Sequence, residues 1–210
     1  MENPVIIFGT KGLGIVALDI FQRNGVVVYG FLDDDKKLHQ TEINTIPVLG
    51  ETDDDGFLKL IGKKCEAFVA IEERIERKKM VEMLIEKRHI MPVNAIHADS
   101  IVSEIAELGH GNLIAARVIL SPKAKIGNHC IVQTGAIIDH QAQVGNFVNI
   151  GSGSVIGAGA IIEDDVFIGT SAVIVGGVQI GKGASVGAGS VVIENVPAKA
   201  RVFGNPAQKM

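Results

Sequence analysis

The sequence predicts two domains of different class, an α/β domain over residues 1–95 and an all-β repeat domain over residues 96–197, followed by a capping tail at 198–210. Eight of the 25 glycines lie before residue 96 and seventeen after it, whereas 29 charged residues lie in 1–95 and 15 in 96–210. This shift predicts a boundary near residues 92–98. The chain is also 47% hydrophobic but only 4% aromatic. We therefore expect a narrow, repetitive core of aliphatic side chains in the second domain.

The first domain alternates strand-like and helix-like segments. Strands are expected at 5–8, 26–32 and 67–71, and helices from the glycine-rich turn to Asn24 and over 74–87. The apolar residues that should face a sheet are Leu13, Val16, Ala17, Ile20 and Phe21 in the first helix, and Ile75, Met80, Val81, Leu84 and Ile85 in the second. This order of elements predicts a small parallel α/β domain of Rossmann-like class.

The second domain carries a six-residue period. An aliphatic residue recurs at every sixth position: Leu108, Ile114, Leu120, Ile126, Val132, Ile138, Val144, Ile150, Ile156, Ile162, Ile168, Ile174, Ile180, Val186 and Val192. Four residues further on, the side chain is again small or branched, and a glycine often follows the aliphatic residue directly, which we interpret as the bend of each repeat. Three such sides close a prism, with five coils over 108–197, and Ile96 and Val102 could add a partial coil. The tail and the α/β domain should cover the two open ends.

Composition and charge argue against several classes of function. The formal net charge of -4 disfavours a nonspecific nucleic-acid binder, and the absence of an apolar run of about 18 residues disfavours membrane insertion. We expect a cytoplasmic protein with Cys65 and Cys130 reduced and without a bound metal, because the two cysteines have no metal-type spacing.

A glycine-rich segment, Gly9-Thr10-Lys11-Gly12-Leu13-Gly14, joins the first strand to the first helix. Such glycines let backbone N–H groups approach a phosphate at a helix N-terminus, although a tight turn would need them equally. The run Asp33-Asp34-Asp35 follows the second strand, where carboxylates can bind ribose hydroxyls or a base. A solvated acidic turn is the alternative, because Asp53-Asp54-Asp55 forms a second such run.

The hexapeptide pattern, the G-x-x-G-x-G segment and the ending Val196-Pro197…Gly204-Asn205-Pro206-Ala207 together resemble the two-domain sugar acyltransferases of bacterial surface-glycan pathways. That family includes bacillosamine and perosamine N-acetyltransferases and sialic-acid O-acetyltransferases. The resemblance implies a left-handed parallel β-helix, a homotrimer, acetyl-CoA as acyl donor between neighbouring β-helices, and a nucleotide-sugar acceptor in the N-terminal domain.

His140 is the candidate general base. It lies two positions after an inward aliphatic residue, outside the core phase, as does His110; a neutral imidazole can accept the proton of an attacking amine or hydroxyl. The resemblance assigns this role to His140. Relatives usually have an acid directly after this histidine, whereas this chain has Gln141, with Asp139 on the other side. Asp139, a carboxylate from elsewhere, or a weaker base remain as alternatives.

Further site residues follow only from the resemblance. The donor is expected at Asn149, Gly151, Gly169, Thr170, Gly187 and Ala188, with Lys199 or Arg201 as possible phosphate partners. The nucleotide sugar is expected at Gly9, Thr10, Lys11, Gly12, Gly14, Asp33, Asp34 and Gly50, the last in a loop at 47–50. Relatives usually have His in place of Leu13 and Gly in place of Glu72.

Four other functions are alternatives to acetyl transfer to a nucleotide-linked 4-amino sugar. O-acetyl transfer to a hydroxyl and a scaffold trimer without catalysis both fit the resemblance, the latter because of Gln141, Asn149 and Leu13. A metalloenzyme of the γ-carbonic-anhydrase type would need convergence of His110, His129 and His140. An NAD-dependent oxidoreductase would need a substrate domain, for which the repeats leave little room.

Overall fold

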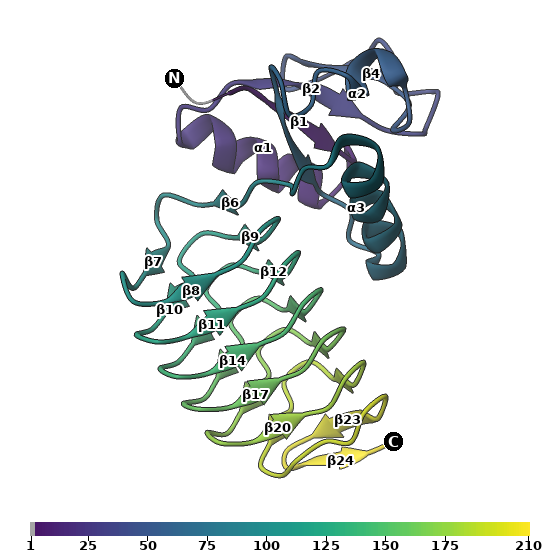
Figure 1. The fold of residues 1–210 in the computed structure, drawn as a ribbon. Coiled ribbons are helices and arrows are strands. Elements are labelled where there is room, and N and C mark those ends of the chain that lie inside the picture. The colour runs from purple at the N-terminus through teal and green to yellow at the C-terminus, as the bar shows by residue number, and fades with distance from the viewer. Residues whose placement is uncertain (1–2) are drawn as a thin grey trace. The chain divides into compact units, whose positions relative to one another are not determined.

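The computed structural model describes residues 3–210, which form two compact units, one ending at Ala98 and the other spanning Asp99–Met210 (Figure 1). The first unit contains a five-stranded sheet in the order β3-β4-β2-β1-β5. Its strands are β1 (Val5–Phe8), β2 (Val28–Leu32), β3 (Glu42–Ile43), β4 (Ile46–Gly50) and β5 (Glu66–Val69). All neighbours are parallel except β3 and β4. The last strand of this unit is β6 (Ala95–Ile96).

The helices of the first unit are α1 (Leu13–Arg23), α2 (Asp55–Leu58) and α3 (Arg74–Arg88). The two long helices and strands β1, β2 and β5 confirm the predicted order. The expected loop at 47–50 was wrong, because these residues belong to β4, which pairs with β2. The expected inner face of α3 was wrong in part: Ile75 and Ile85 are 58% and 37% exposed, whereas Arg77 is buried and donates to the carbonyl of Ile71 at 2.7 Å.

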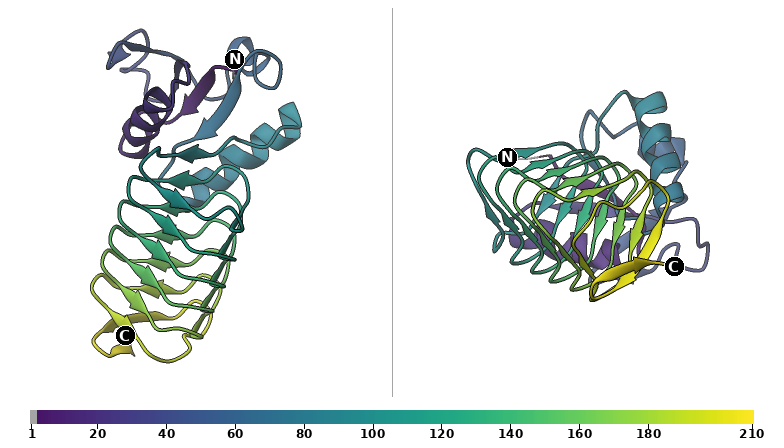
Figure 2. Two further views of the ribbon diagram at one scale, coloured as in Figure 1. Left: turned by 90° about the vertical axis from the view of Figure 1, so that its left-hand side faces the viewer. Right: turned by 90° about the horizontal axis from the view of Figure 1, so that it is seen from below.

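The second unit is a three-sided parallel β-helix, whose stacked coils are visible in both views of Figure 2. Every predicted aliphatic position from Leu108 to Val192 is the second residue of a two-residue strand. The strands are β7 (Ile101–Val102), β8 (Glu107–Leu108), β9 (Leu113–Ile114), β10 (Ile119–Leu120), β11 (Lys125–Ile126), β12 (Ile131–Val132), β13 (Ile137–Ile138), β14 (Gln143–Val144), β15 (Asn149–Ile150), β16 (Val155–Ile156), β17 (Ile161–Ile162), β18 (Phe167–Ile168), β19 (Val173–Ile174), β20 (Gln179–Ile180), β21 (Ser185–Val186) and β22 (Val191–Val192).

From β7 to β19, each strand pairs in parallel with the third strand after it, so that residues 18 apart become neighbours, as in Ile119↔Ile137 and Ile137↔Val155. We name the three sheets after strands of one coil. The β13 sheet is β7-β10-β13-β16-β19-β22, the β14 sheet is β8-β11-β14-β17-β20, and the β15 sheet contains β9-β12-β15-β18-β21. Three of the six-residue repeats predicted from the sequence therefore make one 18-residue coil of the β-helix.

The aliphatic residues from Ile114 to Val192 are buried, as are the small residues four positions later. At the first coil, Leu108 is half-buried and Val102 is 37% exposed, so the predicted partial coil forms strands but no closed core. The C-terminal tail does more than cover the last coil. Its strand β23 (Arg201–Gly204) pairs with β21, and β24 (Ala207–Lys209) turns back on β23 as an antiparallel hairpin.

The prediction that the glycines directly after the aliphatic residues form the bend of each repeat was wrong. The left-handed backbone conformation occurs three residues after every aliphatic position from Leu108 to Val186, for example at Gln141 with φ 59° and Phe147 with φ 56°. The glycines directly after the aliphatic residues instead permit close coil-to-coil packing. A Cβ on Gly151 would lie 2.5 Å from the backbone nitrogen of Thr170, and one on Gly169 would lie 2.5 Å from that of Ala188.

Candidate functional site

The β-helix has three corners, and the predicted site residues lie on two of them. The His140 corner joins the β13 sheet to the β14 sheet, the Asn146 corner joins the β14 sheet to the β15 sheet, and the Gly151 corner joins the β15 sheet back to the β13 sheet. Each corner repeats every 18 residues, so one position forms a column along the axis.

At the His140 corner, Asp139 and His140 form a directly bonded pair. The backbone N–H of His140 donates to Asp139 Oδ1 at 2.7 Å, and His140 Nδ1 lies 3.0 Å from the same oxygen. Since an ionised carboxylate only accepts, Nδ1 carries the proton in this pair and Nε2 is left as the acceptor. The His140 side chain is 57% exposed. This arrangement can take up a proton from a group outside the β-helix.

Asp139 has its pKa held below the usual range, first by the N–H of His140 and then by the imidazole, with Ser121 contributing less. Gln141 follows in the left-handed region, and its N–H donates to the carbonyl of Pro122 at 3.2 Å. Gln141 thus shapes the turn that presents the pair, and Asp139, directly before His140 in the sequence, is the carboxylate bonded to its imidazole.

The residues expected to bind the acyl donor follow the Gly151 corner. Gly151, Gly169 and Gly187 lie in one column on successive coils, with Thr170 and Ala188 in the next column. Asn149 is on the outward side of β15, half-buried, on the adjoining sheet. Within one chain the structure places these residues and His140 on different corners, so it does not bring them together.

The β13 sheet lies between these two corners and has an apolar outer row. Its outward positions are Ile101, Ile119, Ile137, Val155, Val173 and Val191. The equivalent row of the β14 sheet is largely polar: Glu107, Lys125, Gln143, Ile161 and Gln179. The outer face of the β13 sheet is therefore better suited than that of the β14 sheet to burial against another protein surface.

The Asn146 corner carries a hydrogen-bonded column that the sequence analysis missed. Asn146 Oδ1 accepts from the backbone and side chain of Asn128 at 2.9 and 3.1 Å, and Asn146 donates in the same way to Asp164 Oδ1 at 2.8 and 3.2 Å. His110, the other histidine in phase with His140, donates its N–H to Asn128 at 2.8 Å. The 18-residue recurrence of Asn, Asn and Asp was the signal for this column.

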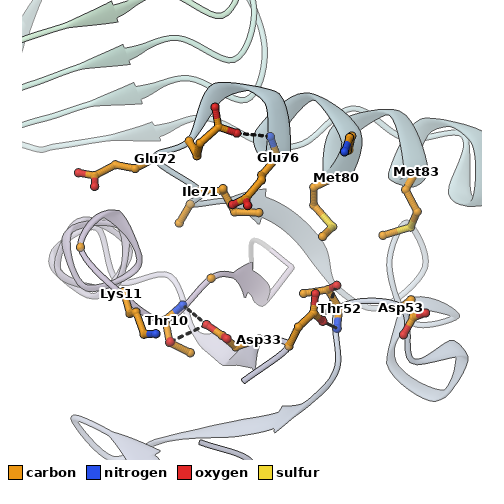
Figure 3. Close-up of a pocket in the computed structure, with 16 residues that line it drawn as sticks. Thr10, Lys11, Asp33, Thr52, Asp53, Ile71, Glu72, Glu76, Met80 and Met83 are labelled. Atoms are coloured by element: carbon orange, nitrogen blue, oxygen red, sulfur yellow. Dashed lines mark hydrogen bonds between the residues drawn. The ribbon is translucent and has the colours of Figure 1, made fainter. Parts of the chain in front are cut away.

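A cavity of about 690 Å³ lies in the first unit, between the glycine-rich turn and α3 (Figure 3). It is lined by Gly9, Thr10, Lys11, Gly12, Asp33, Asp34, Thr52, Asp53, Ala70, Ile71, Glu72, Glu73, Glu76, Lys79, Met80 and Met83. Six of the eight predicted substrate residues are among them. Gly14 and Gly50 are not; a Cβ on Gly14 would collide with the carbonyl of Gly9, so this glycine lets α1 pack on β1. The contributions of Thr52 and of α3 were missed, because they depend on chain segments far from the glycine-rich turn.

The two predicted aspartates of the cavity are bound to its own walls. Asp33 accepts from the N–H and hydroxyl of Thr10 at 3.0 and 2.6 Å, and Asp34 accepts from the N–H and hydroxyl of Thr52 at 2.9 and 2.8 Å. Burial tends to raise the pKa of Asp33, but hydrogen bonds from Thr10 and from the Asp35 N–H lower it overall. Asp33 therefore fixes the glycine-rich turn as an ionised carboxylate.

The charge of the cavity is mainly negative. Its lining has six carboxylates and two lysines, Lys11 and Lys79. No side chain caps α1, which begins after Gly12. The N–H groups of that first turn and the two lysines are thus the groups in the lining that can attract phosphate, whereas the carboxylates suit hydroxyl or amino donors.

Over residues 3–210, no group of three or more His, Cys, Asp or Glu side chains is placed to hold a metal ion. No helix in this part of the chain has the length and apolar character to span a membrane.

Family models match a part of each unit. Residues 4–84 match the PglD N-terminal domain, and residues 159–194 match the bacterial transferase hexapeptide repeat. Comparison with curated proteins gave no match.

Three solved structures resemble the whole chain. PerB from Caulobacter crescentus, in complex with CoA and GDP-perosamine, is 29% identical with a TM-score of 0.90, covering 100% of this chain and 98% of that one. A histidine-to-alanine variant of GDP-perosamine N-acetyltransferase from the same organism, with the same ligands, is 28% identical with a TM-score of 0.90 and the same coverage. The acetyltransferase domain of PglB from Neisseria gonorrhoeae is 26% identical with a TM-score of 0.89, covering 100% of both chains. The predicted fold class, a Rossmann-like α/β domain followed by a left-handed parallel β-helix, is confirmed.

Proposed function

The chain belongs to the two-domain hexapeptide-repeat sugar acyltransferases, and we propose that it transfers the acetyl group of acetyl-CoA to the 4-amino group of a nucleotide-linked sugar. The observation that carries this proposal is the likeness over the full length to an enzyme bound to CoA and GDP-perosamine. Both domains of this chain take part in that likeness, so the similarity extends to the domain expected to hold the acceptor.

His140 is the general base of the proposed reaction. The acceptor nitrogen attacks the thioester carbonyl, a C–N bond forms, and the C–S bond breaks with departure of the CoA thiolate. His140 Nε2 takes the proton released by the nitrogen and can return it to the thiolate. Asp139, bonded to Nδ1 at 3.0 Å, stabilises the imidazolium and replaces the acid that relatives have after the histidine.

A homotrimer accounts for the separation of His140 from the donor residues. The His140 corner and the Gly151 corner are the two margins of the β13 sheet, whose outer row is aliphatic. If the β13 sheets of copies meet around a cyclic axis, the His140 corner of one copy lies beside the Gly151 corner of the next. We infer that each active site forms in this way, with Asn149 donating to the acyl oxygen and Lys199 or Arg201 contacting CoA phosphates.

The cavity of the first unit is the proposed nucleotide-sugar site. The N-terminus of α1 and Lys11 face the phosphates, and carboxylates including Asp53 accept from hydroxyl or amino groups of the acceptor. We place the reaction in the cytoplasm and in bacterial surface-glycan synthesis, on the strength of the family resemblance.

A thiol-release assay with acetyl-CoA and a panel of UDP-, GDP- and dTDP-linked 4-amino sugars tests this function. We expect CoA release with at least one acceptor, with product stable to mild alkali because an amide, not an ester, has formed. His140→Ala should abolish release while the trimer and nucleotide binding persist. An alkali-labile product would favour O-transfer, and nucleotide binding without turnover across the panel would favour the scaffold.

A further inference from the structure

Glu72 places a carboxylate beside the glycine-rich turn of the first unit. A Cβ added to Gly12 would lie 3.7 Å from Cδ, Oε1 and Oε2 of Glu72, and Figure 3 shows Glu72 and Lys11 at the same end of the cavity. Gly12 directly precedes α1, whose first turn has no side-chain cap. The Glu72 carboxylate therefore lies next to the backbone N–H groups that are proposed to hold the phosphates of the acceptor.

The segment after β5 holds the backbone of Glu72 in this position. Arg77 is 1% exposed, and its guanidinium donates to the carbonyls of Ile71 and Glu72 at 2.7 and 3.0 Å. Ala70 packs on the turn itself, because a Cβ on Gly9 would lie 3.0 Å from the Ala70 carbonyl oxygen. The segment that carries Glu72 is thus fixed on one side by α3 and on the other by the glycine-rich turn.

The positive charge near the turn balances only part of this negative charge. Lys11, the lysine of the turn, is paired with Asp35 at 3.7 Å. Asp33 accepts from Thr10 in the same turn, and its pKa is lowered by that contact. A phosphate bound here has the carboxylates of Asp33 and Glu72 as close neighbours. Each further negative charge on the ligand is therefore disfavoured by electrostatic repulsion.

The forms of nucleotide that can enter the cavity differ by one such charge. In a nucleotide sugar both phosphates are esterified, and each carries one negative charge. In a free nucleoside diphosphate the terminal phosphate is a monoester, which loses a second proton near about pH 6. Above that pH the free nucleotide has one more negative charge, located on the phosphate that would otherwise carry the sugar.

We propose that Glu72 makes the cavity selective for intact nucleotide sugars over free nucleoside diphosphates. The inference rests on the proposed use of a nucleotide-linked acceptor and adds a specificity-determining residue to that site. The carboxylate beside Gly12 repels the extra charge of the terminal monoester, whereas an esterified phosphate escapes that part of the repulsion. Free nucleotide then competes less well with the acceptor.

Calorimetry at about pH 8, where the monoester is ionised, tests the selectivity without requiring turnover. The probes are GDP with GDP-mannose and UDP with UDP-glucose. In Glu72→Gln, the Kd of the free diphosphate divided by that of its sugar ester should fall about 3- to 10-fold, because a neutral amide does not repel the extra charge. Glu72→Lys should lower this ratio further. Glu82→Gln removes an exposed carboxylate of α3 outside the cavity lining and should leave the ratio unchanged.

Salt and turnover separate the possible results. The difference in ratio between the wild type and Glu72→Gln should shrink as salt is added, because screening weakens the repulsion. An unchanged ratio in both Glu72→Gln and Glu72→Lys, with CoA released in the acceptor panel, would overturn this inference alone. The expected change in ratio without CoA release from any 4-amino sugar would overturn the proposed function alone. A wild-type chain that binds none of the four probes would overturn the inference together with the proposed acceptor site.

Discussion

Asp139 and His140 are neighbours in sequence that bond twice through one carboxylate oxygen, to the backbone N–H at 2.7 Å and to imidazole Nδ1 at 3.0 Å. The left-handed conformation of Gln141 completes the turn that holds them. The relationship gives the chain a carboxylate–imidazole pair although the position after the histidine is not acidic.

Asp139→Asn tests the contribution of that pair. We expect kcat to fall by about 10- to 100-fold, because an amide stabilises the imidazolium less than a carboxylate does. The KM values should stay close to those of the wild type, because Asp139 acts through His140. Glu194→Gln removes another exposed carboxylate at the same corner and should leave kcat unchanged. A full rate in Asp139→Asn would show that Asp139 only shapes the turn.

Asp33→Asn should destabilise the first unit in a pH-dependent way. The pKa of Asp33 is lowered in the folded state, so its contribution to stability is present above the unfolded value near 4 and is lost as pH falls through the folded value. We expect a loss of about 1 kcal/mol at pH 7 that shrinks below about pH 4, measured by urea unfolding. Asp53→Asn, on an exposed residue, should have little effect. A constant difference across pH would contradict the role given to ionised Asp33.

Val155→Glu should separate the subunits of the proposed trimer. A carboxylate in the middle of the aliphatic row of the β13 sheet would be buried without a partner if copies meet there. Light scattering coupled to size exclusion should then report monomers with unchanged circular dichroism. Gln143→Glu places the same charge on the β14 sheet and should remain trimeric. Trimers in both variants would mean that another face mediates assembly.

Asn146→Ala should weaken the β-helix through the column at its corner. The substitution removes one acceptor of Asn128 and one donor to Asp164, so we expect a loss of about 1–3 kcal/mol in the free energy of unfolding. It should also raise the pKa of Asp164, whose lowered value depends first on the Asn146 backbone bond and also on its side chain. Gln208→Ala, on the exposed side of β24, is the control. Equal stability of the two variants would show that the column is dispensable.

The repeats and most of the first unit could be predicted because their signals are local. The six-residue period places Ile138 inward and His140 outward from residues that are close together in the sequence. The apolar run at 5–8 likewise predicts β1 without information from any other segment. Short strand β4, with Pro47 inside it, lacks such a signal and becomes a strand only by pairing with β2. The burial of Arg77 likewise depends on tertiary structure, because its guanidinium donates a hydrogen bond to the carbonyl of Ile71.

The sequence by itself determined the coil length, the inward residues, the position of His140 outside the core and the glycine-rich turn after β1. Tertiary structure decided which residues meet: Asp139 with His140, Asp33 with Thr10, and Asn146 with Asp164. It also placed His140 on a different corner from Gly151. The sequence period shows whether a side chain points into or out of the β-helix, because this direction depends on local backbone geometry. The partner of that residue depends on the register of strands 16 or 18 residues apart and on packing between distant segments, which only the folded chain specifies.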